Sequence, residues 1–114
     1  MMKDDLVYLR HIRDSITRIF DYTDGMARES FLSSPLHQSA VIREIGVIGE
    51  AAKRVSAKSR KANPAVPWRL MAGMRDKVIH DYFGIDVELV WDTVEKDLPR
   101  LMPKIERLIS SPGK

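Results

Sequence analysis

Residues 40–56 read AVIREIGVIGEAAKRVS, and the apolar side chains of this stretch recur at steps of three and four. That spacing places them on one face of an α-helix and leaves charged side chains on the other faces. Pro35 fits the first turn of such a helix, because the N–H that proline lacks has no helical partner there. We therefore predict a long amphipathic helix from Pro35 to about Lys58. Its core-facing stripe consists of Val41, Ile45, Ile48, Ala52 and Val55.

Helical patterns also flank this helix. Residues 5–24 carry apolar side chains at helical spacing with arginines between them, and Asp24 and Gly25 are expected to end that helix. Residues 56–67, SAKSRKANPAVP, are polar and basic and include two prolines. Because proline and small polar residues favour turns, we predict that this segment is a loop.

Two more helices are predicted in the second half of the chain. One begins at Pro67 or Trp68 and ends at Gly84, a few residues after His80. The other follows Asp86, a good N-cap, and its apolar stripe continues for about six turns, with two prolines that should kink or split it. The sequence contains no alternating strand pattern. The predicted fold class is therefore all-α, an up-and-down bundle of four to five helices.

The composition limits the domain organisation and the chemistry. With 114 residues, 44% of them hydrophobic, the chain suits one helical domain over residues 1–114, and its tail at 110–114 is expected to fray. The formal charge of +3 permits contact with phosphates without requiring it. The absence of cysteine excludes disulfides, thiolate zinc sites and cysteine nucleophiles.

The N-terminus and the hydropathy indicate where the protein acts. The first residues, MMKDDLVYLRHIRD, are charged and lack the apolar run of a signal peptide. No apolar run in the sequence approaches the length that spans a bilayer. We therefore expect a cytoplasmic protein that has no membrane partner.

An unusual group of polar side chains lies in GMRDKVIHDYFG, residues 73–84, at the predicted end of the third helix. On a helix, Asp76 lies four residues before His80 on the same face, and its carboxylate could orient the imidazole. Arg75 and His80 are a step of five apart, which is about 140° around a helix. Because they would meet more easily across two helices related by a two-fold axis, the spacing favours a homodimer.

Arginine and histidine together suit chemistry at a phosphodiester. The guanidinium is a planar fork of donors that matches phosphate oxygens, and histidine, with an ordinary pKa of about 6.5, transfers protons at neutral pH. RNA carries its own nucleophile, the ribose 2′-hydroxyl, so such a pair could cleave it without a metal. The three histidines lie far apart in the sequence, and we predict no metal site.

The pattern Arg75-x-x-x-x-His80-x-Tyr82, with the polar Asp76 directly after the arginine, resembles the signature of the HEPN superfamily, in particular its HepT-type branch. Three stretches resemble that branch in order and separation: AVIREIGVIGEAAKRVS at 40–56, VPWRLMAGMRDKVIHDYFGID at 66–86 and VWDTVEKDLPRL at 90–101. The resemblance covers nearly the whole chain. It implies a HEPN-like helical homodimer that acts on RNA as a ribonuclease toxin.

The resemblance also implies roles for particular residues. Arg75 and His80 of both protomers would form the catalytic groups of a shared cleft, with Asp76 as a supporting neighbour. Tyr82 matches the tyrosine onto which the family's antitoxin, a minimal nucleotidyltransferase, transfers AMP from ATP. This chain contains no nucleotide-binding glycine loop, so we expect no cofactor of its own, and ATP would belong to the antitoxin.

Two other classes of function fit the same residues. The chain could be a non-catalytic substrate-binding or regulatory subunit of the nucleotidyltransferase, with a nucleotide or a partner loop in the cleft. It could also be a plain helical interaction protein, in which cations near a helix end only complement the helix dipole. Toxicity on expression that is lost with Arg75→Ala would favour the ribonuclease.

Three polar residues outside the motif are not assigned to the site. His11 and His37 match no motif position and are interpreted as ordinary, partly exposed histidines. Glu50 is either an exposed helix charge or a support for the motif from the second helix. None of the three is predicted to be catalytic.

Near the predicted loop, we interpret the aromatic residues as packing residues and the basic residues as surface residues. Trp68 and Trp91 occupy core-like positions, although Trp68 beside Arg69 could line a groove. The loop and the end of the preceding helix also carry a cluster of basic residues. We interpret this cluster as a solvated surface, and the alternative is that it guides RNA phosphates. It consists of Lys53, Arg54, Lys58, Arg60 and Lys61.

Overall fold

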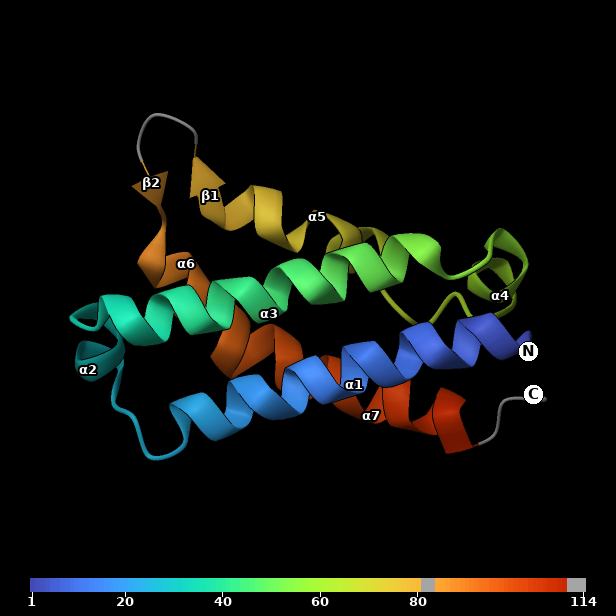
Figure 1. Ribbon diagram of the computed structural model, residues 1–114, viewed down its shortest axis with the longest axis horizontal. Coiled ribbons are helices and arrows are strands. Elements are labelled where there is room, and N and C mark those ends of the chain that lie inside the picture. Colours follow the sequence, from blue (N-terminus) through green and yellow to red (C-terminus); the bar gives the residue numbers. More distant parts are fainter. Residues whose placement is uncertain (81–83, 111–114) are drawn as a thin grey trace.

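The computed structural model describes residues 1–80 and 84–110, and helices make up nearly all of it (Figure 1). The helical elements are α1 (Lys3–Thr23), α2 (Arg28–Leu32), α3 (Pro35–Arg54), α4 (Ala57–Ala62), α5 (Trp68–Val78), α6 (Val87–Asp92), the π-helical turn η1 (Thr93–Asp97) and α7 (Leu98–Ser110). Two short strands, β1 (Ile79–His80) and β2 (Gly84–Ile85), pair antiparallel. The predicted all-α fold class is confirmed.

The core forms where α1 and α3 lie side by side in opposite directions (Figure 1). The predicted stripe of α3 is confirmed, since Val41, Ile45, Ile48, Ala52 and Val55 are all buried. On α1 the buried apolar side chains are Leu9, Ile12, Ile16 and Ile19. Phe31 of α2 packs on Trp91 of α6 with ring centroids 5.1 Å apart, which confirms the packing role predicted for Trp91.

α5 packs against α3 at two glycines of α3. A Cβ atom added to Gly49 would lie 3.3 Å from the carbonyl oxygen of Met71, so a side chain there would force the two helices apart. A Cβ atom added to Gly46 would lie 3.4 Å from Cδ of Arg75, so the Arg75 side chain rests directly against α3. The two glycines of α3 thus allow α5 to approach closely.

The third helix ends earlier than predicted. α5 stops at Val78, and Ile79 is extended with φ −107° and ψ 122°, so the expected continuation past His80 to Gly84 is wrong. Instead, Ile79 pairs with Ile85 and His80 pairs with Gly84 in a β-hairpin. Two consecutive β-branched residues, Val78 and Ile79, favour strand over helix at this point. Gly84, with φ 78°, belongs to the hairpin and does not cap the helix.

The segment 56–67 is not entirely a loop. It contains α4, so the loop prediction is wrong over Ala57–Ala62, and α3 ends at Arg54, before the predicted Lys58. Ser56 is the N-cap of α4, and its hydroxyl oxygen accepts a hydrogen bond from the Ser59 N–H at 3.2 Å. The two prolines of the segment follow α4 and therefore do not interrupt it.

Asp5 of α1 holds α4 against the bundle. This carboxylate is 2% exposed and accepts hydrogen bonds from the Ser56 N–H at 2.8 Å, the Ser56 hydroxyl at 2.8 Å and the Ser59 hydroxyl at 2.5 Å. Burial raises the pKa of Asp5, but the hydrogen bonds from Ser59 and Ser56, together with the N-terminal ammonium, lower it below the ordinary value of 3.8. The ionised form is thus the one that the fold stabilises.

We expect Asp5→Asn to lower the free energy of unfolding by about 1–3 kcal/mol, because the hydrogen bonds to a buried, charged acceptor weaken. Since the folded pKa is depressed, the stability from Asp5 is present above the ordinary pKa of 3.8 and is lost as the pH falls through the folded pKa. Urea denaturation at neutral and acidic pH measures both effects. The exposed neighbour Asp4 provides the control, and an equal loss in Asp4→Asn would contradict the account.

The last helical segment follows the predicted pattern with one distortion. Asp86 caps α6, and its side chain accepts a hydrogen bond from the Leu89 N–H at 3.1 Å. The π-helical turn η1 precedes Pro99, where the missing N–H and the proline ring disturb the regular register, and α7 continues through Pro103. Apart from Ser110, the tail predicted to fray lies outside the described residues. Among the described helices, none is both long and apolar enough to cross a membrane.

Candidate active site

A groove of about 590 Å³ lies between α1, α3 and α5, and Arg75 forms part of its wall. We refer to it as the Arg75 groove. It is lined by Tyr8 and His11 of α1, by Arg43, Gly46, Val47, Glu50, Ala51 and Arg54 of α3, and by Arg75 of α5. Three arginines and a histidine therefore meet at one hollow in the surface.

Two of these arginines have no compensating charge. Within residues 1–80 and 84–110, neither Arg54 nor Arg75 forms an ion pair. Glu50 is the carboxylate in the groove lining, and its Oε1 lies 3.6 Å from Nζ of Lys53. The groove therefore presents positive charge, which suits an anionic ligand such as a phosphate.

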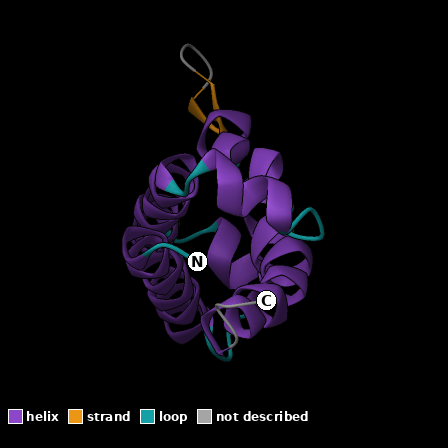
Figure 2. Ribbon diagram, turned by 90° about the vertical axis from the view of Figure 1, so that its right-hand side faces the viewer, coloured by secondary structure: helices purple, strands orange, loops and turns teal. Residues whose placement is uncertain are grey.

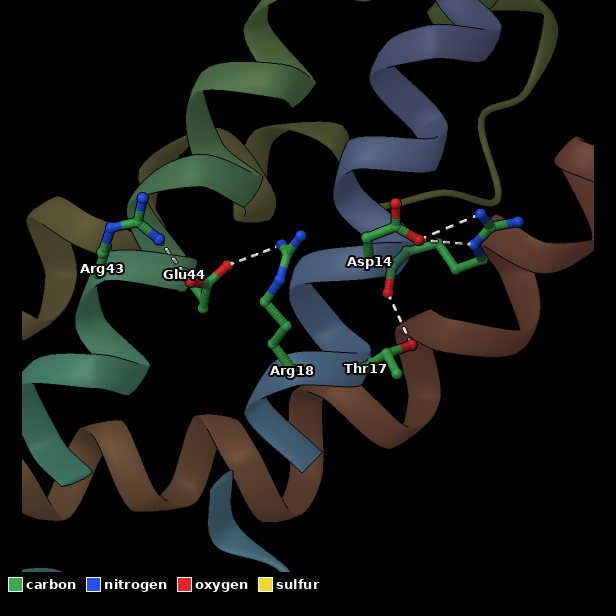
Figure 3. A network of polar contacts seen from close by, with 6 residues as sticks. Asp14, Thr17, Arg18, Arg43 and Glu44 are labelled. Carbon is green, nitrogen blue, oxygen red and sulfur yellow. Dashed lines mark hydrogen bonds and ion pairs between the residues drawn. The ribbon is translucent and has the colours of Figure 1, made fainter. Parts of the chain in front are cut away.

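Arg43 differs because a buried carboxylate neutralises it. Glu44 is 1% exposed and lies between α1 and α3, where its Oε2 is 2.9 Å from Nη1 of Arg43 and its Oε1 is 3.3 Å from Nη1 of Arg18 (Figure 3). A buried carboxylate is costly unless it is paired, so these two arginines are needed to stabilise it. Arg43 is therefore less available to a ligand than Arg54 and Arg75.

His11 belongs to the groove, although the sequence motif does not include it. Its ring is exposed and stands edge-on to Tyr8 with ring centroids 6.2 Å apart. One feature of the sequence did indicate the groove. On the face of α3 away from the core, four groove residues recur as a stripe at helical spacing: Arg43, Gly46, Glu50 and Arg54. Nothing in the spacing indicates that α1 borders this stripe, and His11 was missed for that reason.

The motif residues occupy two separate places in one chain. Arg75 and Asp76 are exposed in the last turn of α5. His80 is exposed in a hairpin that projects beyond the helices, as both views of the fold show, and it is not among the described residues that line the Arg75 groove (Figures 1 and 2). Because α5 ends between them, the prediction that Asp76 and His80 share a helical face is wrong. Tyr82 lies outside the described residues.

The remaining candidates have mainly structural surroundings. His37 lies in the first turn of α3, with its Nδ1 2.6 Å from the hydroxyl oxygen of the N-cap Ser34. Glu50 is an exposed helix charge that also lines the groove. In the part of the chain that the structure describes, no three His, Asp or Glu side chains are grouped so that they could hold a metal ion.

Comparison with known proteins adds family information to this geometry. A family model described as "Ribonuclease HepT-like" matches residues 12–108. A Thermococcus cleftensis protein named "Probable ribonuclease HepT" is 45% identical over 101 residues, which cover 89% of this chain and 92% of that protein. A Caldanaerobacter subterraneus protein named a "Putative RNase" is 34% identical over 108 residues, which cover 95% of this chain and 96% of that protein.

A longer relative contains the same region. A Methanocaldococcus jannaschii protein named a "Gamma-glutamylcyclotransferase and putative RNase" is 41% identical over 109 residues. The match covers 96% of this chain and 49% of that protein. No solved structure matches the chain.

Proposed function

Because the chain belongs to the HepT-like ribonuclease family, we propose that it is a metal-independent endoribonuclease that acts in the cytoplasm as the toxin of a toxin–antitoxin pair. One observation supports the proposal most strongly. Arg75 rests against α3 at Gly46, in a groove where its charge and that of Arg54 are uncompensated. Such a pre-positioned guanidinium suits the extra negative charge that a phosphodiester acquires during cleavage.

The separation of Arg75 and His80 supports a homodimer. In one chain, Arg75 belongs to the groove and His80 to the projecting hairpin. Two chains related by a two-fold axis would place each hairpin against the groove of the other, and a two-fold interface creates this contact twice. The hairpin, and not a continuous helix, would carry His80 to the cleft, which still combines Arg75 and His80 of both protomers.

The proposed reaction uses the nucleophile that RNA carries. His80 removes the proton from a ribose 2′-hydroxyl, the 2′-oxygen attacks the adjacent phosphorus, and the bond from phosphorus to the 5′-oxygen breaks. The proton that His80 has taken up then passes from its imidazolium to the departing 5′-oxygen, so the products are a 2′,3′-cyclic phosphate and a 5′-hydroxyl. Arg75 donates hydrogen bonds to the non-bridging oxygens as their charge increases, and Asp76 supports the arginine.

RNA cleavage in chelator tests this proposal. Purified protein is incubated with total tRNA or messenger RNA, and we expect cleavage that chelation leaves unchanged. Product ends identify the reaction, because attack by the 2′-oxygen leaves a cyclic phosphate. Intact RNA with every substrate and with or without divalent metal would contradict the ribonuclease and favour the non-catalytic subunit of a nucleotidyltransferase.

The position of Arg75 on Gly46 can be tested directly. Gly46→Leu should displace the guanidinium and reduce cleavage by about 100-fold, as a misplacement of roughly 1 Å does in other enzymes. Gly46→Ala is the matched control, because its Cβ would be in ordinary contact with the Arg75 side chain at 3.4 Å. We expect Gly46→Ala to cleave at nearly the wild-type rate. Equal activity of the two variants would exclude this role for Gly46.

Regulation is proposed to act at Tyr82. The phenol oxygen attacks the α-phosphorus of ATP held by a nucleotidyltransferase antitoxin, pyrophosphate leaves, and the phenol proton passes to a base of that enzyme. Tyr82 follows the proposed catalytic His80 by two residues in the sequence, so the negative charge of an attached AMP would oppose the binding of RNA phosphates at His80. This chain would need no cofactor of its own.

Tyr82→Phe should abolish AMP transfer, because the acceptor oxygen is removed. Mass spectrometry after incubation with ATP and the antitoxin detects the added nucleotide. The control is Tyr22→Phe, which removes an exposed tyrosine of α1, and we expect this variant to receive AMP as the wild type does. AMP addition to Tyr82→Phe at the wild-type level would assign the modification to a different residue.

A further inference from the structure

A second groove lies beside α4, at the other end of the contact between α3 and α5, and has a volume of about 530 Å³. We refer to it as the Trp68 groove. It is lined by Ala52 and Lys53 of α3, by Ala57, Arg60 and Lys61 of α4, and by Trp68, Arg69 and Ala72 of α5. Its described lining thus combines four cations, three alanines and one indole, and contains no carboxylate.

The positive charge of the Trp68 groove is largely uncompensated. Among the described residues, Arg60, Lys61 and Arg69 form no ion pair, and Lys53 has only the exposed pair with Glu50 at 3.6 Å. In addition, Nε of Arg60 is buried and has no hydrogen-bond partner in the described part of the chain. A buried donor of this kind is costly without an acceptor, and a phosphate oxygen would supply one.

Trp68 is held in a fixed position at the side of this groove. Its indole N–H donates a hydrogen bond to the carbonyl oxygen of Asn63 at 3.0 Å. The ring is only partly buried, and the small side chains of Ala52, Ala57 and Ala72 leave open space beside it. An immobilised, partly exposed aromatic ring among cations is the arrangement with which proteins bind single-stranded nucleic acid, since bases stack on the ring and phosphates contact the cations.

We propose that the Trp68 groove binds single-stranded RNA, with a base against Trp68 and backbone phosphates at Arg60, Lys61 and Arg69. The inference rests on the proposed function, because it makes this groove an additional contact for the RNA that the Arg75 groove cleaves. From the sequence, guidance of RNA was the alternative interpretation of the basic residues, and a packing role was favoured for Trp68. The structure adds a groove in which the two occur together.

The geometry of α5 connects the two grooves. Trp68, Ala72 and Arg75 are separated by steps of four and three and therefore lie along one face of the helix. Seven residues of helix advance by about 10 Å. A stacked strand advances by about 3.4 Å per nucleotide, so a base on Trp68 would be about three nucleotides from the phosphate at Arg75. One RNA strand can thus occupy both grooves.

RNA binding is measured separately from RNA cleavage. A protein that binds RNA in the Trp68 groove can then be distinguished from one that cleaves RNA at the Arg75 groove. The His80→Ala protein is titrated into a fluorescein-labelled oligouridylate of about ten nucleotides, a length within the site size of single-strand binding proteins. Trp68→Ala should weaken binding by about 5- to 150-fold, the range that loss of one base–aromatic stack causes. Trp68→Phe keeps a ring and should retain most of the affinity, which separates stacking from a general packing defect.

The cations have a charge-matched control. Arg60→Gln with Lys61→Gln should reduce the slope of log K against log salt by about 1.4, because each phosphate contact on a single strand contributes about 0.7. Arg100→Gln with Lys104→Gln removes the same charge from exposed positions of α7 and should change affinity and slope little. Equal effects of the two double variants would overturn the proposal, because binding would then follow net charge alone.

Tryptophan fluorescence reports occupancy of the groove itself. The chain contains two tryptophans, and Trp91 is buried against Phe31, so only Trp68 is expected to respond when RNA binds. Quenching that is absent in Trp68→Phe would support the groove even if the wild-type protein cleaved no RNA. The proposal would be overturned if RNA bound without any change in Trp68 emission, or if no RNA bound at all. An acidic protein surface would then become the alternative occupant.

Discussion

His80→Ala should reduce the rate of RNA cleavage by about 100- to 10,000-fold, the range associated with loss of a general acid or base. The fold should be unaffected, because His80 is exposed in β1 and contributes no side chain to the core. Cleavage of a labelled RNA in chelator measures the rate, and circular dichroism with light scattering confirms that fold and oligomeric state are retained.

The control for His80 is His37→Ala. His37 is bound to Ser34 at the start of α3, so the variant loses an imidazole without touching the Arg75 groove. We expect it to cleave like the wild type after a small loss of stability. A His80→Ala protein that cleaves at the wild-type rate would remove His80 from the catalytic site.

Arg75→Ala should lower cleavage by about 100- to 1,000-fold, which is typical for loss of one group that stabilises developing negative charge. The loss should appear mainly in kcat, because the guanidinium is proposed to bind the reacting phosphate most strongly in the transition state. Substitutions in the Trp68 groove should instead raise KM. This difference between kcat and KM distinguishes the catalytic groove from the additional RNA contact.

Two comparisons define the role of Arg75 further. Arg75→Lys keeps the charge but loses the planar fork, so it should recover only part of the activity. Arg107→Ala removes an exposed arginine from α7 and should leave cleavage unchanged. Expression in cells provides a parallel readout, because toxicity should be lost with Arg75→Ala and retained with Arg107→Ala. Full activity of Arg75→Ala would contradict the assignment.

The helical framework was predictable because the apolar residues that become buried recur in the sequence at helical spacing. The stripe of α3 from Val41 to Val55 is buried as predicted, and the N-cap Asp86 begins α6 as predicted. The boundaries that failed depend on contacts between distant segments. α4 is stabilised by Asp5, which lies more than fifty residues earlier in the chain, and no local pattern at 56–67 indicates that contact.

The candidate site was predictable in its residue types but not in its arrangement. The motif identified Arg75 and His80, yet the turn from helix to hairpin at Val78 depends on pairing with Ile85 and was missed. His11 was missed because it comes from α1, and helix spacing alone does not show which helices share a groove. The role of Gly46 also requires the structure, since it depends on the path of the Arg75 side chain.

If the active site is shared between protomers, two inactive variants should restore each other in a mixed dimer. Arg75→Ala and His80→Ala chains carrying different tags are refolded together, mixed dimers are isolated through both tags, and RNA cleavage is measured in chelator. A mixed dimer retains one complete pair, Arg75 of one chain and His80 of the other, so an active site shared between protomers predicts about half the wild-type activity per dimer. Mixed dimers that remain as inactive as either parent would contradict the shared cleft.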